Sequence, residues 1–442
     1  MDFLKSVGRK IEKTAEDFFY FFSRPTLAER LVITGALVGT AAGFTAYLFI
    51  RLINFLSDWT LSVLPKPMSF WHYVGYLFFP ALGVFLGYVL IYFLCPEAHG
   101  HGTEVLNVLP EKSPWLAARV ASVKLIASAL TIGLGGSAGQ EGPVIQIGGA
   151  TASFLGKYLR VPDEDIRVLI SAGAAAGLGA SFGAPLAAVF FIMEVTLKDF
   201  ASSLFSSIVI ASVSGAVTSR LLMGDVDFVV GLTYTWSKPS DLLVYALVGL
   251  LCAPLGILYK MAIEKVEAHC AQEKSPVSSY LLPILGGILV GEIALFYPEV
   301  MGTGKKIVDA AFMGGLGGFR MGVVAFAKIA ATALTLGTGG SGGAFMPAIF
   351  IGAAAGSSLS GVLGHLFGNA TLARGSFAVA GTASVITSSY RAPITGIIMA
   401  LEMSRDYGIV MPVMATCAIS LVVASSVERS RVASREKCYI PK

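Results

Sequence analysis

Long stretches without a charged residue divide this chain, and charged residues gather between them. Leu31–Ile50, Tyr73–Cys95, Val168–Met193 and Tyr407–Val427 each contain no Asp, Glu, Lys or Arg. A helix needs roughly 20 residues to cross a hydrocarbon core of about 30 Å. Because lipid offers no partner to open backbone groups, apolar stretches of this length are expected to be helical. The pattern predicts an all-α polytopic membrane protein.

The longest uncharged stretch, residues 329–373, does not fit a single helix. It is too long for one span, and it contains the run GTGGSGGAFMP at residues 337–347. Glycine lowers helix stability in a helix interior, whereas proline is accepted in a first helical turn. We therefore expect the helix to break at the glycines and a new helix to begin inside the membrane.

Composition and charge support a membrane protein with both ends at one surface. Charged residues make up only 14% of the 442 residues, mean hydropathy is +0.74, and net charge is +4. Both termini are basic, so the positive-inside rule predicts that both are cytoplasmic. Residues 1–24 combine basic residues with five consecutive aromatics, which favours an interfacial helix over a cleaved signal peptide.

The sequence carries no recognisable catalytic or metal-binding motif. The five cysteines are scattered without a CxxC pair, and the five histidines lack metal-ligand spacing. We also find no phosphate-binding loop, nucleophile elbow or dinucleotide fingerprint. We therefore expect a protein that is not an enzyme, holds no metal or cofactor and binds no nucleic acid.

Two blocks of sequence occur twice, in the same order. Residues 136–150 match 340–354 at an offset of 204, and residues 172–195 match 380–403 at an offset of 208. The identical pairs are Gly136/Gly340, Ser137/Ser341, Gly139/Gly343, Pro143/Pro347, Ile147/Ile351, Gly148/Gly352, Gly173/Gly381, Ala184/Ala392, Pro185/Pro393 and Glu194/Glu402. The chain is thus expected to contain two transmembrane repeats, 25–225 and 226–442.

Repeats of this kind are typical of transporters with a site near the bilayer midplane. Sequence alone does not fix whether the repeats are parallel or inverted. An inverted arrangement is favoured physically, because the two equivalent glycine loops then approach one point from opposite faces.

The glycine loops predict an anion site. A helix that begins inside the membrane has unpaired N–H groups and a positive dipole end, and both attract anions. Glycine lets these N–H groups come close to an ion. Glu141, within GGSAGQEGP, is then a tethered anion that occupies the place of the travelling ion until it is protonated. The alternatives are glycines that serve only close helix packing and a glutamate that is purely structural.

At these motifs the sequence resembles the CLC family of chloride channels and chloride/proton exchangers. GQEGP (139–143) resembles the family loop that carries the external gating glutamate, and GAFMP (343–347) resembles the family GxFxP loop. The resemblance implies a gate at Glu141 and an anion site made by Gly139, Gln140, Gly142, Ala344 and Phe345. It also implies an all-helical homodimer, with an inverted repeat of tilted and broken helices and one pore in each subunit.

Three positions depart from the family pattern. GHGTE (100–104) stands where the family has GSGIP, so His101 replaces a serine that contacts the central anion. An imidazole N–H either donates to the anion or points away. Gln140 replaces a basic residue, which weakens the attraction of the outer mouth for anions. Val195 stands where family exchangers carry an internal proton-transfer glutamate, whereas Glu194 beside it is repeated as Glu402 and is expected to be structural.

The C-terminal segment REKCYIPK resembles the family pattern around an inner-gate tyrosine, which points to Tyr439 as a gate and anion contact. A plain interfacial tyrosine is the alternative. Family members often continue into cytoplasmic nucleotide-binding modules, and the sequence contains no such module.

Valine cannot carry a proton, so the sequence favours a passive, voltage- or pH-gated chloride channel. The alternatives are a chloride/proton antiporter, a fluoride-handling relative, and, weakest, a membrane enzyme or cation transporter. The expected partners are chloride and similar anions, the lipid bilayer and a second copy of the chain. The expected location is a prokaryotic inner membrane.

Overall fold

The computed structural model describes residues 27–64, 69–102, 115–198, 200, 202–224, 238–272, 275–367 and 374–438. The first half contains α2 (Leu27–Val63), α3 (Phe70–Leu94), η1 (Pro96–Ala98), α4 (Ala118–Gly133), α5 (Glu141–Tyr158), α6 (Ile166–Phe182), α7 (Pro185–Phe191), the π-helix η2 (Ile192–Leu197) and α8 (Ser202–Met223). The second half contains α9 (Asp241–Gln272), α10 (Pro276–Phe296), η3 (Pro298–Val300), α11 (Lys305–Phe312), α12 (Phe319–Gly337), α13 (Phe345–Phe367), α14 (Arg374–Tyr390), α15 (Pro393–Ser404), η4 (Tyr407–Ile409) and α16 (Val410–Cys438).

Eight helices within these ranges are long and apolar enough to cross a membrane. Their outer faces carry large exposed apolar side chains, such as Phe55, Phe93, Leu243 and Phe296. A surface of this kind suits lipid rather than water. The prediction of an all-α polytopic membrane protein is confirmed, whereas the predicted helix at 1–24 lies outside the described residues.

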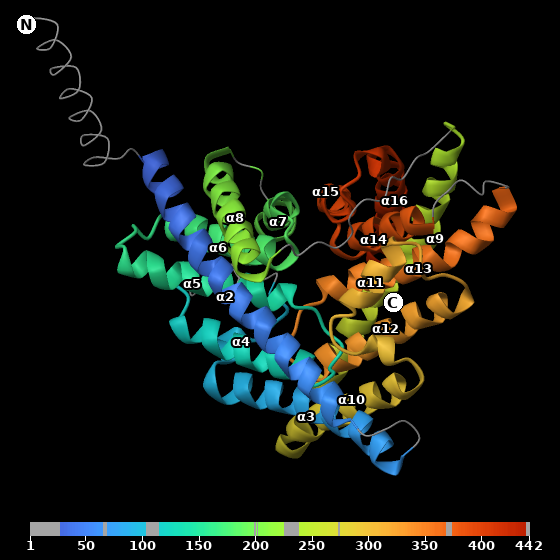
Figure 1. Cartoon of the computed structure of the whole chain (residues 1–442), viewed down its shortest axis with the longest axis horizontal. Coiled ribbons are helices and arrows are strands. Elements are labelled where there is room, and N and C mark those ends of the chain that lie inside the picture. The colour runs from blue at the N-terminus through green and yellow to red at the C-terminus, as the bar shows by residue number, and fades with distance from the viewer. Residues whose placement is uncertain are drawn as a thin grey trace, which may run out of the picture.

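The helices of the two halves repeat one another. α5 and α13 begin at an offset of 204, and α6 and α7 begin 208 residues before α14 and α15. Packing repeats as well, because α5 packs on α6 as α13 packs on α14, and α2 packs on α8 as α9 packs on α16. In Figure 1 the first-half helices α2, α5, α6 and α8 lie on one side and α9, α13, α14 and α16 on the other, with α3 and α10 packed together at the lower edge.

The predicted break occurs at the glycine run. α12 ends at Gly337 and α13 begins at Phe345, so Pro347 lies in the first turn of the new helix. α5 begins in the same way at Glu141, with Pro143 in its first turn. The N-termini of both helices are buried.

A local twofold axis passes between the two glycine loops. Gly139 and Gly343 occupy equivalent places in the repeats, and each donates its N–H to the carbonyl of the other at 2.7 Å in an antiparallel bridge. The hydroxyl of Ser137 lies 2.9 Å from that of Thr332, and the equivalent pair, Ser341 and Ser128, lies at 2.7 Å. The loops therefore run in opposite directions where they meet, as an inverted repeat requires.

Two glutamates exchange helix caps between the halves. Glu194 of η2 accepts hydrogen bonds from the N–H groups of Ile394 and Thr395 at the start of α15, at 3.2 and 2.8 Å. Glu402 of α15 accepts in turn from the N–H groups of Leu186 and Ala187 at the start of α7. Because a carboxylate at a helix N-terminus satisfies unpaired donors and the dipole together, both glutamates tie the halves together.

Replacing Glu194 with glutamine is expected to lower the free energy of unfolding by about 0.5–2 kcal/mol, the usual range for a lost N-cap. The amide NH2 would then face N–H and O–H donors that the carboxylate now accepts. Glu402→Gln should cost a similar amount, and Glu292→Gln on the exposed face of α10 should cost nothing. Thermal unfolding of the purified variants measures this, and unchanged midpoints for both cap variants would contradict the structural role.

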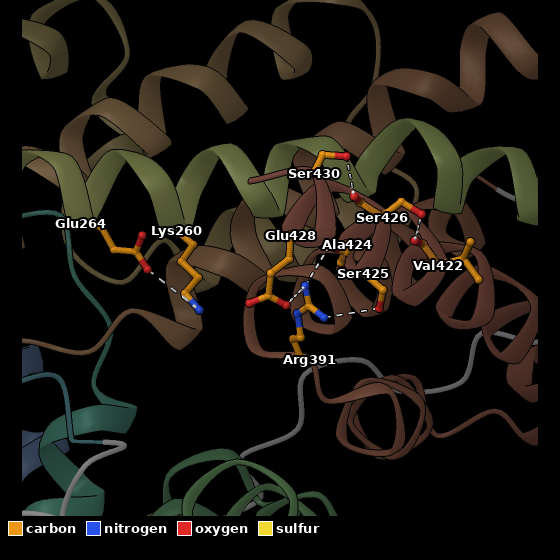
Figure 2. A network of polar contacts seen from close by, with 9 residues as sticks. All are labelled: Lys260, Glu264, Arg391, Val422, Ala424, Ser425, Ser426, Glu428 and Ser430. Carbon is orange, nitrogen blue, oxygen red and sulfur yellow. Dashed lines mark hydrogen bonds and ion pairs between the residues drawn. The ribbon is translucent and has the colours of Figure 1, made fainter. Parts of the chain in front are cut away.

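Arg391 shows how the second half departs from the first at a helix end. α6 is followed by Gly183 at φ +63°, and the equivalent residue after α14 is Arg391 at φ +59°. This left-handed region is uncommon for residues with a side chain. In Figure 2 the Arg391 guanidinium reaches α16, where it donates to the Ala424 carbonyl at 2.8 Å and pairs with Glu428 at 2.6 Å. These contacts hold the strained residue in place.

Candidate functional site

Three glycine-containing loops meet at the buried start of α5. A Cβ atom on Gly142 would overlap the carbonyl oxygen of His101 and lie 2.9 Å from Cα of Gly343. A Cβ atom on Gly102 would overlap the backbone of Gly142, and Gly102 also has φ +93°. Only glycine permits this approach, because the neighbours in each case are backbone atoms rather than flexible side chains.

Glu141 is the carboxylate at this meeting point. It is the first residue of α5, and its side chain is fully buried. Oε2 accepts a hydrogen bond from the N–H of Met346 at 3.0 Å, in the first turn of α13. Oε1 has no hydrogen-bond partner among the described residues. The carboxylate thus lies at the N-terminus of α13, where the peptide N–H groups and the helix dipole favour an anion.

Aromatic rings enclose the other side of the α13 start. The Phe345 ring packs on Phe191 at a centroid distance of 4.8 Å, on Tyr390 at 5.4 Å and on Phe182 at 6.0 Å. The carbonyl of Ala344 accepts a hydrogen bond from the Tyr259 hydroxyl at 2.7 Å. Tyr259 therefore fixes the residue that precedes the α13 N-terminus, a role that sequence reasoning missed.

A cavity of about 540 Å³ extends from Glu141 toward solvent. Its walls come from the 100–102 loop, α5, η2, α9, α13 and α14. The lining includes His101, Glu141, Gly142, Phe191, Val195, Thr196, Lys198, Tyr259, Lys260, Glu264, Glu267, Ala344, Phe345 and Tyr390. The cavity thus connects solvent-exposed polar side chains with the wall in which the buried Glu141 lies.

Two predicted anion contacts are engaged elsewhere. The N–H of Gly139 is donated to Gly343, so it is not free to bind an anion. The side-chain amide of Gln140 donates to the hydroxyl of Ser181 at 2.8 Å, which turns it toward α6. Gly142, Ala344 and Phe345 line the cavity beside Glu141, and their role in anion binding stays a prediction.

His101 lines the cavity, but its ring is paired with a carboxylate. Nε2 lies 2.5 Å from Oε1 of Glu267 on α9. This nitrogen is therefore directed at Glu267, and only the other ring nitrogen and the backbone N–H remain for an anion. The pairing could not be read from sequence, because 166 residues separate the two.

Two buried lysines that sequence reasoning missed hold the loops in place. Nζ of Lys124 donates to the carbonyls of Ala98 and Gly100 at 3.0 and 2.8 Å, beside His101. Lys328 makes the equivalent contacts, with two carbonyls at 2.8 Å on the 300–302 loop. The repeat offset of 204 relates the two lysines and could have revealed them. Charged hydrogen bonds of this kind are stronger than neutral ones, so both loops are fixed from behind.

Val195 lies in η2 and contributes to the cavity wall, and Glu194 beside it is engaged in the cap on α15. A π-helical segment in a helix is frequent at functional sites. Tyr439, the predicted inner gate, lies outside the described residues, as does Glu104. Within the described residues, no group of three or more His, Cys, Asp or Glu side chains could hold a metal ion.

Comparison with known proteins identifies the family. The family model described as voltage gated chloride channel matches residues 82–425, more than three quarters of the chain. The chain belongs to the CLC family. The resemblance drawn from GQEGP and GAFMP is thereby confirmed, and with it the expected all-helical fold. The expected homodimer stays a prediction.

Curated relatives in this family are similar along nearly their whole length. The chain is 29% identical over 432 residues to the H(+)/Cl(-) exchange transporter ClcA of Vibrio parahaemolyticus, covering 95% of this chain and 91% of the relative. It is 29% identical over 399 residues to the protein of the same name from Klebsiella pneumoniae, covering 88% and 84%.

Solved structures show the same fold. A slow cyanobacterial Cl-/H+ antiporter superimposes with a TM-score of 0.84 at 24% identity, over 94% of this chain and all of that chain. A eukaryotic CLC transporter superimposes with a TM-score of 0.75 at 23% identity, over 90% and 72%.

The expectation of a passive channel is wrong. The curated relatives are named exchange transporters, and they match over most of both chains. The expectation rested on Val195 alone, as though one missing titratable side chain left the proton without a path. The cavity holds other titratable groups, among them His101 and Glu267, which come from segments remote in sequence.

Proposed function

We propose that this protein exchanges chloride for protons across a membrane. The observation that carries the proposal is the buried Glu141 carboxylate, hydrogen-bonded to the N–H of Met346 at the start of α13 and facing a polar cavity. The names of the curated relatives support the same reaction. The N-terminus of α13 thus holds either the Glu141 carboxylate or a chloride ion, one after the other.

The exchange cycle follows from the chemistry of that position. While ionised, Glu141 occupies the N-terminus of α13 and excludes chloride. A proton neutralises it, the attraction of the helix dipole for the carboxyl group is lost, and chloride replaces it. When chloride leaves, the carboxyl group gives up its proton and returns. Partial charges bind the ion weakly enough for release, which transport requires.

The setting of the protein is part of the same proposal. We propose a homodimer in a prokaryotic inner membrane, with both basic termini in the cytoplasm and lipid against the exposed apolar helix faces. The exchange step at α13 involves peptide N–H groups, Glu141 and the two ions, and we propose neither a cofactor nor enzymatic activity.

A chloride gradient across proteoliposomes, with internal pH recorded, tests the exchange. Outward chloride movement should drive protons inward against their gradient when the membrane potential is clamped. Removing chloride from both sides should stop the proton movement. Chloride flux with no accompanying proton movement in the unaltered protein would contradict the proposal.

A further inference from the structure

The cavity contains a carboxylate, Glu267, that the sequence analysis did not single out. Val195 lines this cavity at the position of the family's internal proton-transfer glutamate, and Glu267 lines it from α9. We propose that His101 and Glu267 form a proton-transfer pair that carries protons between solvent and Glu141. This inference rests on the proposed exchange function.

The pair lines the same cavity as the buried carboxylate and is itself partly exposed to solvent. Nε2 of His101 and Oε1 of Glu267 are 2.5 Å apart, within direct hydrogen-bond reach of each other. The His101 side chain is 24% exposed and that of Glu267 is 40% exposed, so solvent reaches both. The backbone carbonyl of His101 contacts Gly142, the residue after Glu141.

The chemistry of the two groups suits the task. An imidazole can both accept and donate a proton, and a carboxylate partner orients its ring. Val195 and the aromatic side chains of Phe191 and Phe345 line the same cavity without a titratable group. The imidazole–carboxylate pair is therefore supplied by the 100–102 loop and α9.

Other charged and titratable groups face the same cavity. Lys260 and Glu264 form an ion pair one turn away on α9, at 3.9 Å, and the dashed line in Figure 2 joins them. Lys198 lies at the end of η2, and Tyr259 and Tyr390 contribute phenols. Glu264 is thus engaged with a lysine at the exposed edge, whereas Glu267 is engaged with the only titratable side chain of the 100–102 loop.

The transfer balances without any co-reactant. Solvent delivers a proton to the Glu267–His101 pair, and the pair gives it through cavity water to a Glu141 oxygen. One N–H bond breaks and one O–H bond forms, so His101 becomes neutral and Glu141 becomes an uncharged carboxylic acid. The reverse steps return the proton when chloride moves in the opposite direction.

Proteoliposome flux measurements on Glu267→Gln and His101→Asn test the pair, with Glu264→Gln as the matched control. Positioned proton transfer contributes about 10²–10⁴-fold to a rate. We therefore expect both pair variants to lower proton flux per chloride by roughly 10²-fold, while Glu264→Gln keeps the ratio of the unaltered protein. The pH profile of proton uptake should also change in the pair variants and not in the control.

A second variant separates proton transfer from a structural role. Adding Val195→Glu to Glu267→Gln restores a carboxylate to the cavity wall, and proton flux should recover in part. Unchanged coupling in both pair variants would overturn the inference. A double variant that is folded, as its chloride flux shows, but recovers no proton flux would overturn it as well. If the unaltered protein moves no protons at all, the proposed exchange function is wrong. The flux of the unaltered protein shows this by itself, so that outcome is distinct from failure of the proton-transfer pair.

Discussion

Replacing Glu141 with glutamine is expected to abolish proton movement driven by a chloride gradient. The amide has the shape of the carboxylic acid, and its oxygen can still accept the N–H of Met346, but it cannot take up a proton. It also carries no negative charge to compete with chloride at the start of α13. Chloride should therefore move down its own gradient without protons, and paired chloride and pH recordings on proteoliposomes measure both.

Glu292→Gln is the matched control, since this glutamate lies exposed on α10 and the same change should leave coupling intact. Residual proton pumping by Glu141→Gln would mean that another group carries the exchanged proton. That result would remove the central step of the proposed cycle, whatever the chloride flux.

Replacing Gly142 with alanine is expected to disrupt the site more than any side-chain truncation. The added methyl group would overlap the His101 carbonyl and crowd Cα of Gly343, so two backbones must separate. Overpacking of this kind costs about 3 kcal/mol, equivalent to a loss of roughly 10²-fold in a binding constant. Calorimetric titration of chloride into the purified protein should show that loss, together with a lower thermal midpoint.

Gly361→Ala provides the control on α13 itself. A Cβ atom there would meet no atom within 4 Å, and Gly361 lies in the helix interior. Alanine at such a position is neutral or stabilising by about 0.5–1 kcal/mol. Equal chloride affinity in Gly142→Ala and Gly361→Ala would show that the three loops do not meet as described.

The fold was predictable because its main constraint acts on the chain locally. Lipid requires each spanning segment to satisfy its own backbone, so uncharged stretches of about 20 residues had to be helices. The duplication could also be detected from the sequence, since matched glycines, prolines and glutamates recur at offsets of 204 and 208. The break before α13 followed from the same glycines.

The anion site was predictable in part for a related reason. A buried helix N-terminus attracts anions. The glutamate at the start of α5 and the proline in the first turn of α13 therefore indicated where the anion site lies. Family motifs added Phe345 and Ala344. Lys124 and Lys328 were overlooked, although the same offset relates them.

Only the tertiary structure decided which polar groups share the cavity. His101 and Glu267 are 166 residues apart, and nothing in either local sequence indicates the other. Glu194 and Glu402 occupy equivalent positions in the two repeats, and each caps a helix of the opposite repeat. Considering Val195 without these neighbours therefore led to the incorrect expectation of a passive channel.

The sequence by itself determined the helices, the duplication, and the polarised loop ends that favour an anion, because these depend on backbone hydrogen bonding and on side chains close in the chain. The tertiary structure alone decided that Gly139 is paired, that the imidazole of His101 meets a carboxylate, and that Glu141 reaches α13. A proton path depends on distances between side chains, and those distances are fixed only when the two repeats pack against each other.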